Sequence, residues 1–166
     1  MIKHTLTIAY TEVSGMSELS EGDRHLLKEA WKACELAYAP YSNFKVGAAL
    51  VLDNDLVFNG NNQENAAYPS GICAERVAVF TASSQYPGVP IKSMAVVAKT
   101  EVFNLSSPVT PCGACRQVIA EYETLSGAPI RILLQGNSDK IWIIEGIANL
   151  LPLMFHGGDL KSTPNI

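Results

Sequence analysis

Apolar positions along the chain recur with two spacings, and each spacing predicts one kind of element. Apolar and polar residues alternate over 4–10, which predicts a strand there. Five further apolar or alternating runs predict strands at 44–52, 56–62, 91–100, 130–136 and 140–146. Asp53, Asn54 and Asp55 separate the first two of these runs, so these two strands are expected to form a β-hairpin.

The first helix is predicted from residues spaced three and four apart. Ser20 and Asp23 resemble a capping box, and the apolar residues that follow them recur at helical spacing. This helix is expected to end near Ala39, because Pro40 cannot continue it.

Two more helices and one short helix follow. An apolar helix is predicted over 73–84, a third helix begins just behind Pro111, and a short helix over 147–155 is interrupted by Pro152. Strands that alternate with helices favour an α/β fold, in which helices pack on a sheet. The early hairpin indicates that this sheet is mixed and not purely parallel.

Composition narrows the function classes. Of the 166 residues, 48% are hydrophobic and 17% are charged, which is typical of one globular domain spanning 1–166. A net charge of −4 without a Lys/Arg run disfavours nucleic acid as a partner, and no apolar stretch approaches the roughly 20 residues that span a bilayer. Four cysteines without a targeting segment suit a reducing, cytoplasmic compartment.

Candidate chemistry is concentrated in three cysteines. Cys112 and Cys115, three residues apart, fall on one face of a helix's first turn and form either half a zinc site or a redox pair. Cys73 starts another helix, so three thiols can meet where two helix N-termini converge. Three protein ligands leave a fourth tetrahedral position open, which is typical of catalytic zinc.

Two charged residues follow Cys73 directly. Glu75 would lie beside the metal as a proton carrier, and Arg76 could donate hydrogen bonds to the thiolates and offset their negative charge. Alternatively, both are ordinary exposed charges at a helix end. Cys34 is interpreted as a small core residue and not as a fourth ligand. The three histidines lack metal-ligand spacing and are expected on the surface.

Three motifs together resemble the small, homotetrameric, zinc-dependent cytidine deaminases. They are "YAPYSNFKVGAAL", "GNNQENAAYPSGICAER" and "PCGACRQ", in that order. The resemblance covers about 20–155, which leaves 1–19 as an N-terminal extension and the tail after Phe155 without an assigned role. It implies a three-layer α/β/α sandwich and hydrolysis of cytidine or deoxycytidine to uridine or deoxyuridine and ammonia, in pyrimidine salvage.

The resemblance also implies residue roles. Cys73, Cys112 and Cys115 would bind one Zn²⁺ per chain, and Glu75 would move protons. The implied substrate contacts are Asn62 and Glu64 at the ribose 3′-hydroxyl, Phe44 against the pyrimidine, the backbone around Ala74 at the base, Tyr68 near the ribose of a neighbouring subunit's site, and Phe155 contributed by a neighbouring subunit.

Rival interpretations stay open at this point. Blasticidin S deaminases share much of the motif pattern, and tRNA- or nucleotide-acting deaminases share the zinc chemistry. A nucleotide substrate would need basic phosphate ligands, and the loops offer little beyond Lys45. A structural zinc module and a dithiol redox protein are alternatives from other function classes.

Overall fold

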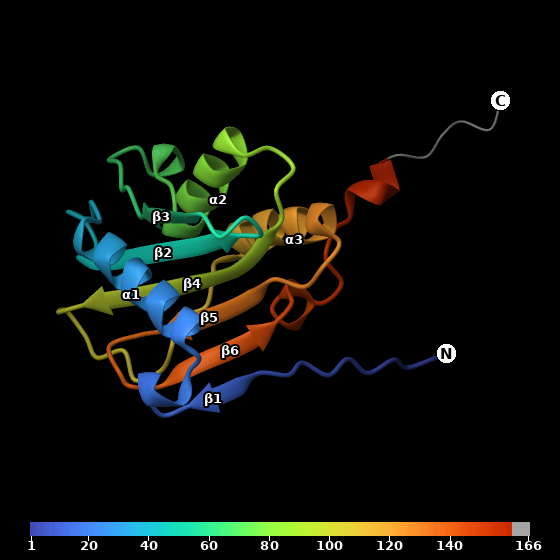
Figure 1. Cartoon of the computed structure of the whole chain (residues 1–166), viewed down its shortest axis with the longest axis horizontal. Coiled ribbons are helices and arrows are strands. Elements are labelled where there is room, and N and C mark those ends of the chain that lie inside the picture. The colour runs from blue at the N-terminus through green and yellow to red at the C-terminus, as the bar shows by residue number, and fades with distance from the viewer. Residues whose placement is uncertain (161–166) are drawn as a thin grey trace.

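The computed structural model describes residues 1–160 and contains one six-stranded sheet with the strand order β1-β6-β5-β4-β2-β3 (Figure 1). Only β4 and β5 run parallel, and the other neighbours are antiparallel. The strands are β1 Thr11–Val13, β2 Phe44–Leu52, β3 Val57–Asn61, β4 Ile91–Thr100, β5 Arg131–Gln135 and β6 Ile141–Glu145; the helices are α1 Glu21–Glu35, α2 Ala74–Gln85 and α3 Gly113–Ser126.

Helices cover both faces of this sheet, with α1 in front and α2 and α3 behind it in Figure 1. The central strands are therefore buried on both sides. On β2, Ala48 and Leu50 contribute to the core under α2 and α3, whereas Ala49 contributes to the core under α1. The α/β sandwich with a mixed sheet that the sequence predicts is confirmed.

A close approach of backbone to backbone positions the first turn of α2. Gly60 on β3 lies directly under this turn, and a Cβ atom at Gly60 would overlap the Ala74 carbonyl and the Ala78 nitrogen. Only glycine lets the helix approach the strand this closely. The start of α2 is thus fixed against the sheet, together with Cys73, its N-cap residue.

The first helix begins as predicted and ends earlier than predicted. The Ser20 hydroxyl accepts a hydrogen bond from the Asp23 backbone N–H at 3.1 Å, which caps α1. The helix ends at Glu35 and not near Ala39. Tyr38 instead bonds through its backbone to Asn62 and Glu64, so this segment joins the loop that follows β3.

The N-terminal strand is displaced from its predicted position. The alternating run 4–10 contains no strand, and β1 forms at Thr11–Val13, where it pairs with Ile141–Ile143 of β6. Just before β1, the Ala9 N–H donates to the Asn149 side-chain oxygen at 2.9 Å and not to a strand backbone. At Ala9, a hydrogen bond to the Asn149 side chain takes the place of a backbone bond to β6, and the pairing with β6 is limited to Thr11–Val13.

The C-terminal segment also differs from expectation. The predicted helix over 147–155 is a single 3-10 turn at Ile147–Asn149, because Pro152 cannot continue a helix and Leu153 adopts a positive φ of 58°. No helix within residues 1–160 is long and apolar enough to cross a membrane.

Candidate metal centre and substrate cavity

Three thiols meet where the N-termini of α2 and α3 converge. Cys73 is the N-cap residue of α2, Cys112 is the N-cap residue of α3, and Cys115 lies one turn into α3. The Cys73 and Cys112 sulfurs are 3.8 Å apart, and the Cys112 and Cys115 sulfurs are 3.5 Å apart. All three sulfurs lie within 4.8 Å of one another, so the predicted convergence is present in the structure.

This cluster fits a tetrahedral metal. Sulfurs about 2.3 Å from a zinc ion at tetrahedral angles lie roughly 3.8 Å from one another, close to the separations found here. Neither N-cap cysteine makes a side-chain capping bond, so both sulfurs remain free for another partner. All four cysteines in the chain are free thiols.

The electrostatic environment favours a thiolate at Cys73. The pKa of the Cys73 thiol is lowered to about 5, first because the Cys115 thiol donates a hydrogen bond to it and then because Arg76 does. The pKa of Cys115 is raised, since its proton is held by that same hydrogen bond and its side chain is buried. Negative charge therefore gathers on the sulfur at the start of α2, where the helix dipole also favours it.

Glu75 lies beside the thiols and is buried, with 4% of its surface exposed. Burial raises the pKa of its carboxyl group, and the charge of the Cys73 thiolate raises it further. Glu75 also lines the cavity described below, so one polar group faces both the thiols and the cavity. The alternative of an exposed helix-end carboxylate does not fit this burial.

Arg76 points at the same thiols. Its Nη2 donates to the Cys73 sulfur at 3.7 Å. Its Nε is one of two buried side-chain N or O atoms within residues 1–160 that have no hydrogen-bond partner. A guanidinium held against a thiolate cluster supplies positive charge where several thiolates would otherwise repel one another.

A cavity of about 420 Å³ opens beside the thiols. Its walls come from β2 and β4, from the loop between β3 and α2, from the first turn of α2, and from the segment that leads into α3. Phe44 at the start of β2 is half-buried on one wall and stacks on Phe103, with ring centroids 6.2 Å apart. Phe44 therefore lies at the cavity that Cys73 and Cys112 also line.

Asn62 and Glu64 both line this cavity but have different surroundings. The Asn62 amide continues the β-ladder past the end of β3: it accepts from the Val46 N–H at 2.8 Å and donates to the Phe44 carbonyl at 2.9 Å. Glu64 accepts from the Tyr41 N–H at 2.9 Å and from the Ser42 hydroxyl. The Ser42 hydrogen bond lowers the pKa of the Glu64 carboxyl group.

The remaining three predicted contacts differ in how they relate to the cavity. The Ala74 side chain is completely buried in the core beneath α2, and Ala74 is absent from the cavity wall. Tyr68 lines the cavity with 78% of its surface exposed. Phe155 is 57% exposed and lies away from the cavity wall, and its carbonyl accepts from Gln117 Nε2 at 3.0 Å.

Other candidates lie away from the thiols, as the sequence indicates. Cys34 on α1 is completely buried in the core on the opposite face of the sheet, and burial raises the pKa of its thiol to about 11. His4, His25 and His156 are all exposed.

Sequence reasoning missed two residues near the site. Ser42 donates to Glu64, and its position in the "YSNF" stretch next to Phe44 is the only signal that points to it. Arg116 follows Cys115 directly and bonds to three groups around the start of α3. Its adjacency to the cysteine pair is visible in the sequence, but its partners are not.

Known proteins share this arrangement. The model of the cytidine and deoxycytidylate deaminase zinc-binding region matches residues 20–126. The chain is 46% identical over 137 residues to the cytidine deaminase of Sporosarcina psychrophila, a match that covers 82% of this chain and 93% of that protein. It is 44% identical over 139 residues to the cytidine deaminase of Halalkalibacterium halodurans, covering 82% and 96% of the two chains.

A solved structure gives the same result. The crystal structure of cytidine deaminase from Burkholderia pseudomallei matches with a TM-score of 0.69 and 40% identity, over 82% of this chain and all of that one. The N-terminal arm (residues 1–10) and β1 precede the family match. This match begins at Ser20 and includes all three clustered thiols. Fold, thiol cluster and sequence likeness agree, and the chain belongs to the cytidine deaminase family.

Proposed function

We propose that this protein is a zinc-dependent cytidine deaminase that converts cytidine and deoxycytidine, with water, into uridine and deoxyuridine and ammonia. One observation carries the proposal: a buried carboxyl group, Glu75, lies beside three convergent thiols and lines the same cavity as Cys73 and Cys112. Cys73, Cys112 and Cys115 would hold one zinc ion per chain. When bound, zinc supplies a Lewis acid that lowers the pKa of a water molecule toward neutrality.

Glu75 moves the protons of the reaction. It takes one proton from the attacking water and delivers it to N3 of the cytosine ring. It then takes the second proton, from the hydroxyl now on C4, and passes it to the departing amine, which leaves as ammonia while the C4 carbonyl forms. Its burial suits this role, because burial raises the pKa of the Glu75 carboxyl group and so makes it a better proton acceptor than an exposed carboxylate. Arg76 supports the site by donating to the Cys73 sulfur, which offsets the negative charge of the thiolates.

Substrate binding is assigned to the cavity walls. Phe44 packs on the pyrimidine, a contact worth about 1–3 kcal/mol by nucleic-acid precedent. Glu64, oriented by Ser42, accepts from the ribose 3′-hydroxyl. The Asn62 side-chain amide is hydrogen-bonded to the Val46 N–H and to the Phe44 carbonyl. It therefore bonds to the ribose through the second N–H or the second lone pair that these two contacts leave unused. The backbone around Ala74, between the lining residues Cys73 and Glu75, is assigned to the base, and Tyr68 to the ribose of a neighbouring subunit's site.

The charges around the cavity favour a nucleoside over a nucleotide. Among the described residues that line the cavity, Arg76 is the one cation, and its guanidinium is already bonded to Cys73. Lys45 follows Phe44 on β2 and contacts the Glu35 carbonyl at the end of α1, away from the cavity. A 5′-phosphate would therefore find no basic partner among the described lining residues.

The proposal includes a homotetramer with shared sites and a role in pyrimidine salvage in the cytoplasm. The free thiols support a reducing compartment. Phe155 supports the shared site, because it is an exposed aromatic outside its own chain's cavity.

Incubation with cytidine, deoxycytidine, their 5′-monophosphates and blasticidin S, followed by ultraviolet absorbance and zinc analysis, tests the proposal. We expect turnover of the two nucleosides and one zinc per chain. Turnover of blasticidin S alone would contradict the proposed substrate, and a protein without zinc would contradict the metal site.

A further inference from the structure

Arg116 follows Cys115 on α3, and its half-buried guanidinium donates three hydrogen bonds. Its Nε donates to the Pro111 carbonyl at 2.7 Å, and its Nη2 donates to the Thr110 hydroxyl at 2.8 Å. Its Nη1 donates to the Leu150 carbonyl at 2.6 Å. One guanidinium therefore binds two consecutive residues before Cys112 and one residue of the C-terminal segment.

The first two contacts fix the approach to the metal ligand. Pro111 is buried, and it immediately precedes Cys112, the N-cap residue of α3. A proline has no N–H to donate and fixes its own φ, so its carbonyl is the backbone group through which this turn can be held. Since Arg116 occupies that carbonyl, it limits where the Cys112 sulfur can lie.

The third contact ties this turn to the C-terminal segment. Leu150 follows the 3-10 turn Ile147–Asn149, and Gln117, the neighbour of Arg116, donates to the Phe155 carbonyl. Two adjacent side chains of α3 thus hold two points of the segment that carries Phe155. The Asn149 amide in turn accepts from the Ala9 N–H of the N-terminal arm.

Arg116 itself does not touch the substrate cavity. Thr110 and Cys112 line that cavity, whereas Arg116 lines a separate, largely apolar cavity of about 310 Å³ together with Thr110, Leu150 and residues of the N-terminal arm. Arg116 therefore acts on the site through the backbone of 110–112.

We propose that Arg116 is a positioning residue that sets the place of the Cys112 sulfur and couples the thiol cluster to the C-terminal segment. The inference rests on the proposed function in that it takes the three thiols as zinc ligands. The three contacts use three separate nitrogens of the planar guanidinium, whereas a lysine ammonium donates all of its N–H groups from a single nitrogen and cannot reach acceptors spread around the fork.

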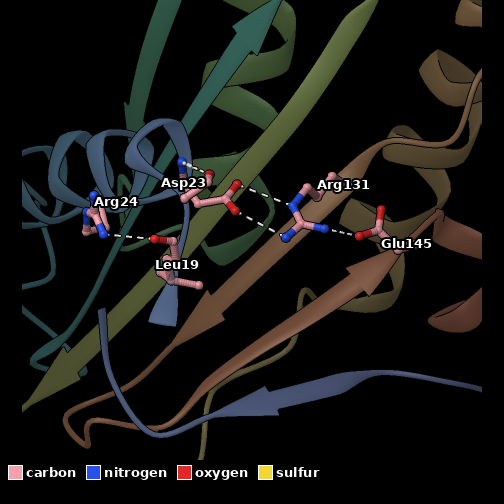
Figure 2. A network of polar contacts seen from close by, with 6 residues as sticks. Leu19, Asp23, Arg24, Arg131 and Glu145 are labelled. Carbon is pink, nitrogen blue, oxygen red and sulfur yellow. Dashed lines mark hydrogen bonds and ion pairs between the residues drawn. The ribbon is translucent and has the colours of Figure 1, made fainter. Parts of the chain in front are cut away.

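Arg116→Met tests this proposal, with Arg24→Met as the matched control. Arg24 is also a half-buried arginine that donates to a backbone carbonyl, that of Leu19 at 2.8 Å, but it lies on α1 across the sheet (Figure 2). Zinc affinity, measured by competition with a chromophoric chelator, is expected to fall about 10–100-fold in Arg116→Met, as for other residues that orient metal ligands. It is expected to be unchanged in Arg24→Met.

A second measurement separates positioning from general loosening. In metal-free protein, the rate at which iodoacetamide modifies Cys112 should change in Arg116→Met, while the rates at Cys73 and Cys34 stay at their wild-type values. Arg116→Lys should change both readouts in the same direction, and it serves if Arg116→Met does not fold. Wild-type zinc affinity and wild-type Cys112 reactivity would overturn the proposal, and so would equal acceleration at all three cysteines. A wild-type protein that binds no zinc would instead overturn the proposed function, and Cys112 reactivity would still decide the role of Arg116.

Discussion

Arg131 on β5 donates two parallel hydrogen bonds to Asp23 on α1, from Nε to Oδ1 at 3.3 Å and from Nη2 to Oδ2 at 3.1 Å (Figure 2). The same guanidinium reaches Glu145 on β6 with Nη1. The Asp23 side chain is 11% exposed and that of Arg131 35% exposed. A charged group that is largely shielded from water has to find its partner within the protein, so this contact fixes the start of α1 over the sheet.

We expect Arg131→Met to lower the free energy of unfolding by about 1–3 kcal/mol, because it leaves the Asp23 carboxylate shielded without its partner. Urea denaturation measures this change. Lys92→Met is the control, since its ion pair with Asp55 is exposed on both sides and is worth at most about 1 kcal/mol. Equal stability of the two variants would contradict the prediction.

Glu75→Gln should keep zinc and fold but lose activity. The amide has the volume of the carboxyl group and cannot carry protons, so kcat is expected to fall by at least the 10²–10⁴-fold that is typical of general acid–base catalysis. Glu121→Gln, an exposed position on α3, provides the control. Activity of Glu75→Gln within a few-fold of wild type, with zinc still bound, would exclude Glu75 as the proton carrier.

Local patterns predicted most of the fold. The bounds of β2 and β4 match their apolar runs, because strands covered by helices on both faces are apolar throughout. β1 was misplaced because alternation shows only that a segment can be a strand, whereas pairing with β6 decides which residues become one.

The thiol cluster could be predicted for a similar reason. Its cysteines occupy positions at helix starts, and helix starts are visible in the sequence. The contacts of Ser42 with Glu64 and of Arg116 with Leu150 join segments far apart in the chain. No local pattern encodes such contacts, so the partners of these two residues could be found only in the folded structure.

Cys112→Ala should lose zinc together with activity, because two protein thiols then remain in the cluster. Zinc content after dialysis against a mild chelator measures this loss. Cys34→Ala should retain a full equivalent of zinc, since Cys34 lies in the core on the other face of the sheet. If Cys112→Ala kept its zinc, the proposed ligand set would be wrong.

The pKa of Cys34 makes stability depend on pH in the alkaline range. Folding raises this pKa from 9.0 to about 11, so the folded chain holds the thiol proton more tightly than the unfolded chain does. The resulting stabilisation, roughly 2–3 kcal/mol, is complete below about pH 9 and is lost as the pH rises toward 11.

Cys34→Ala should remove this part of the alkaline decline. Urea denaturation of both proteins between pH 8 and about pH 11 measures it as the difference between two curves, which cancels the titration of other groups. Parallel curves for wild type and variant would show that the Cys34 thiol does not ionise on unfolding.

Several aromatic and apolar side chains are left exposed by the single chain. Leu153 is 89% exposed, Tyr68 is 78% exposed and Phe155 is 57% exposed. Tyr68 lies at the cavity, whereas Phe155 belongs to the segment that Arg116 and Gln117 hold against α3. Large apolar side chains held in place and left exposed are typical of an interface between chains.

We therefore expect a homotetramer by light scattering, in which Phe155 of one chain completes the cavity of another. Phe155→Ala should raise KM for cytidine by about 5- to 150-fold if it removes a stacking contact of about 1–3 kcal/mol. Zinc content should stay at one per chain, because Phe155 lies away from the thiols. Leu153→Ala is the control for a general loss of apolar surface, and it should leave KM unchanged as long as the tetramer persists. A fully active monomer at micromolar concentration would contradict the shared cavity, since a chain that works alone needs no aromatic from its neighbour.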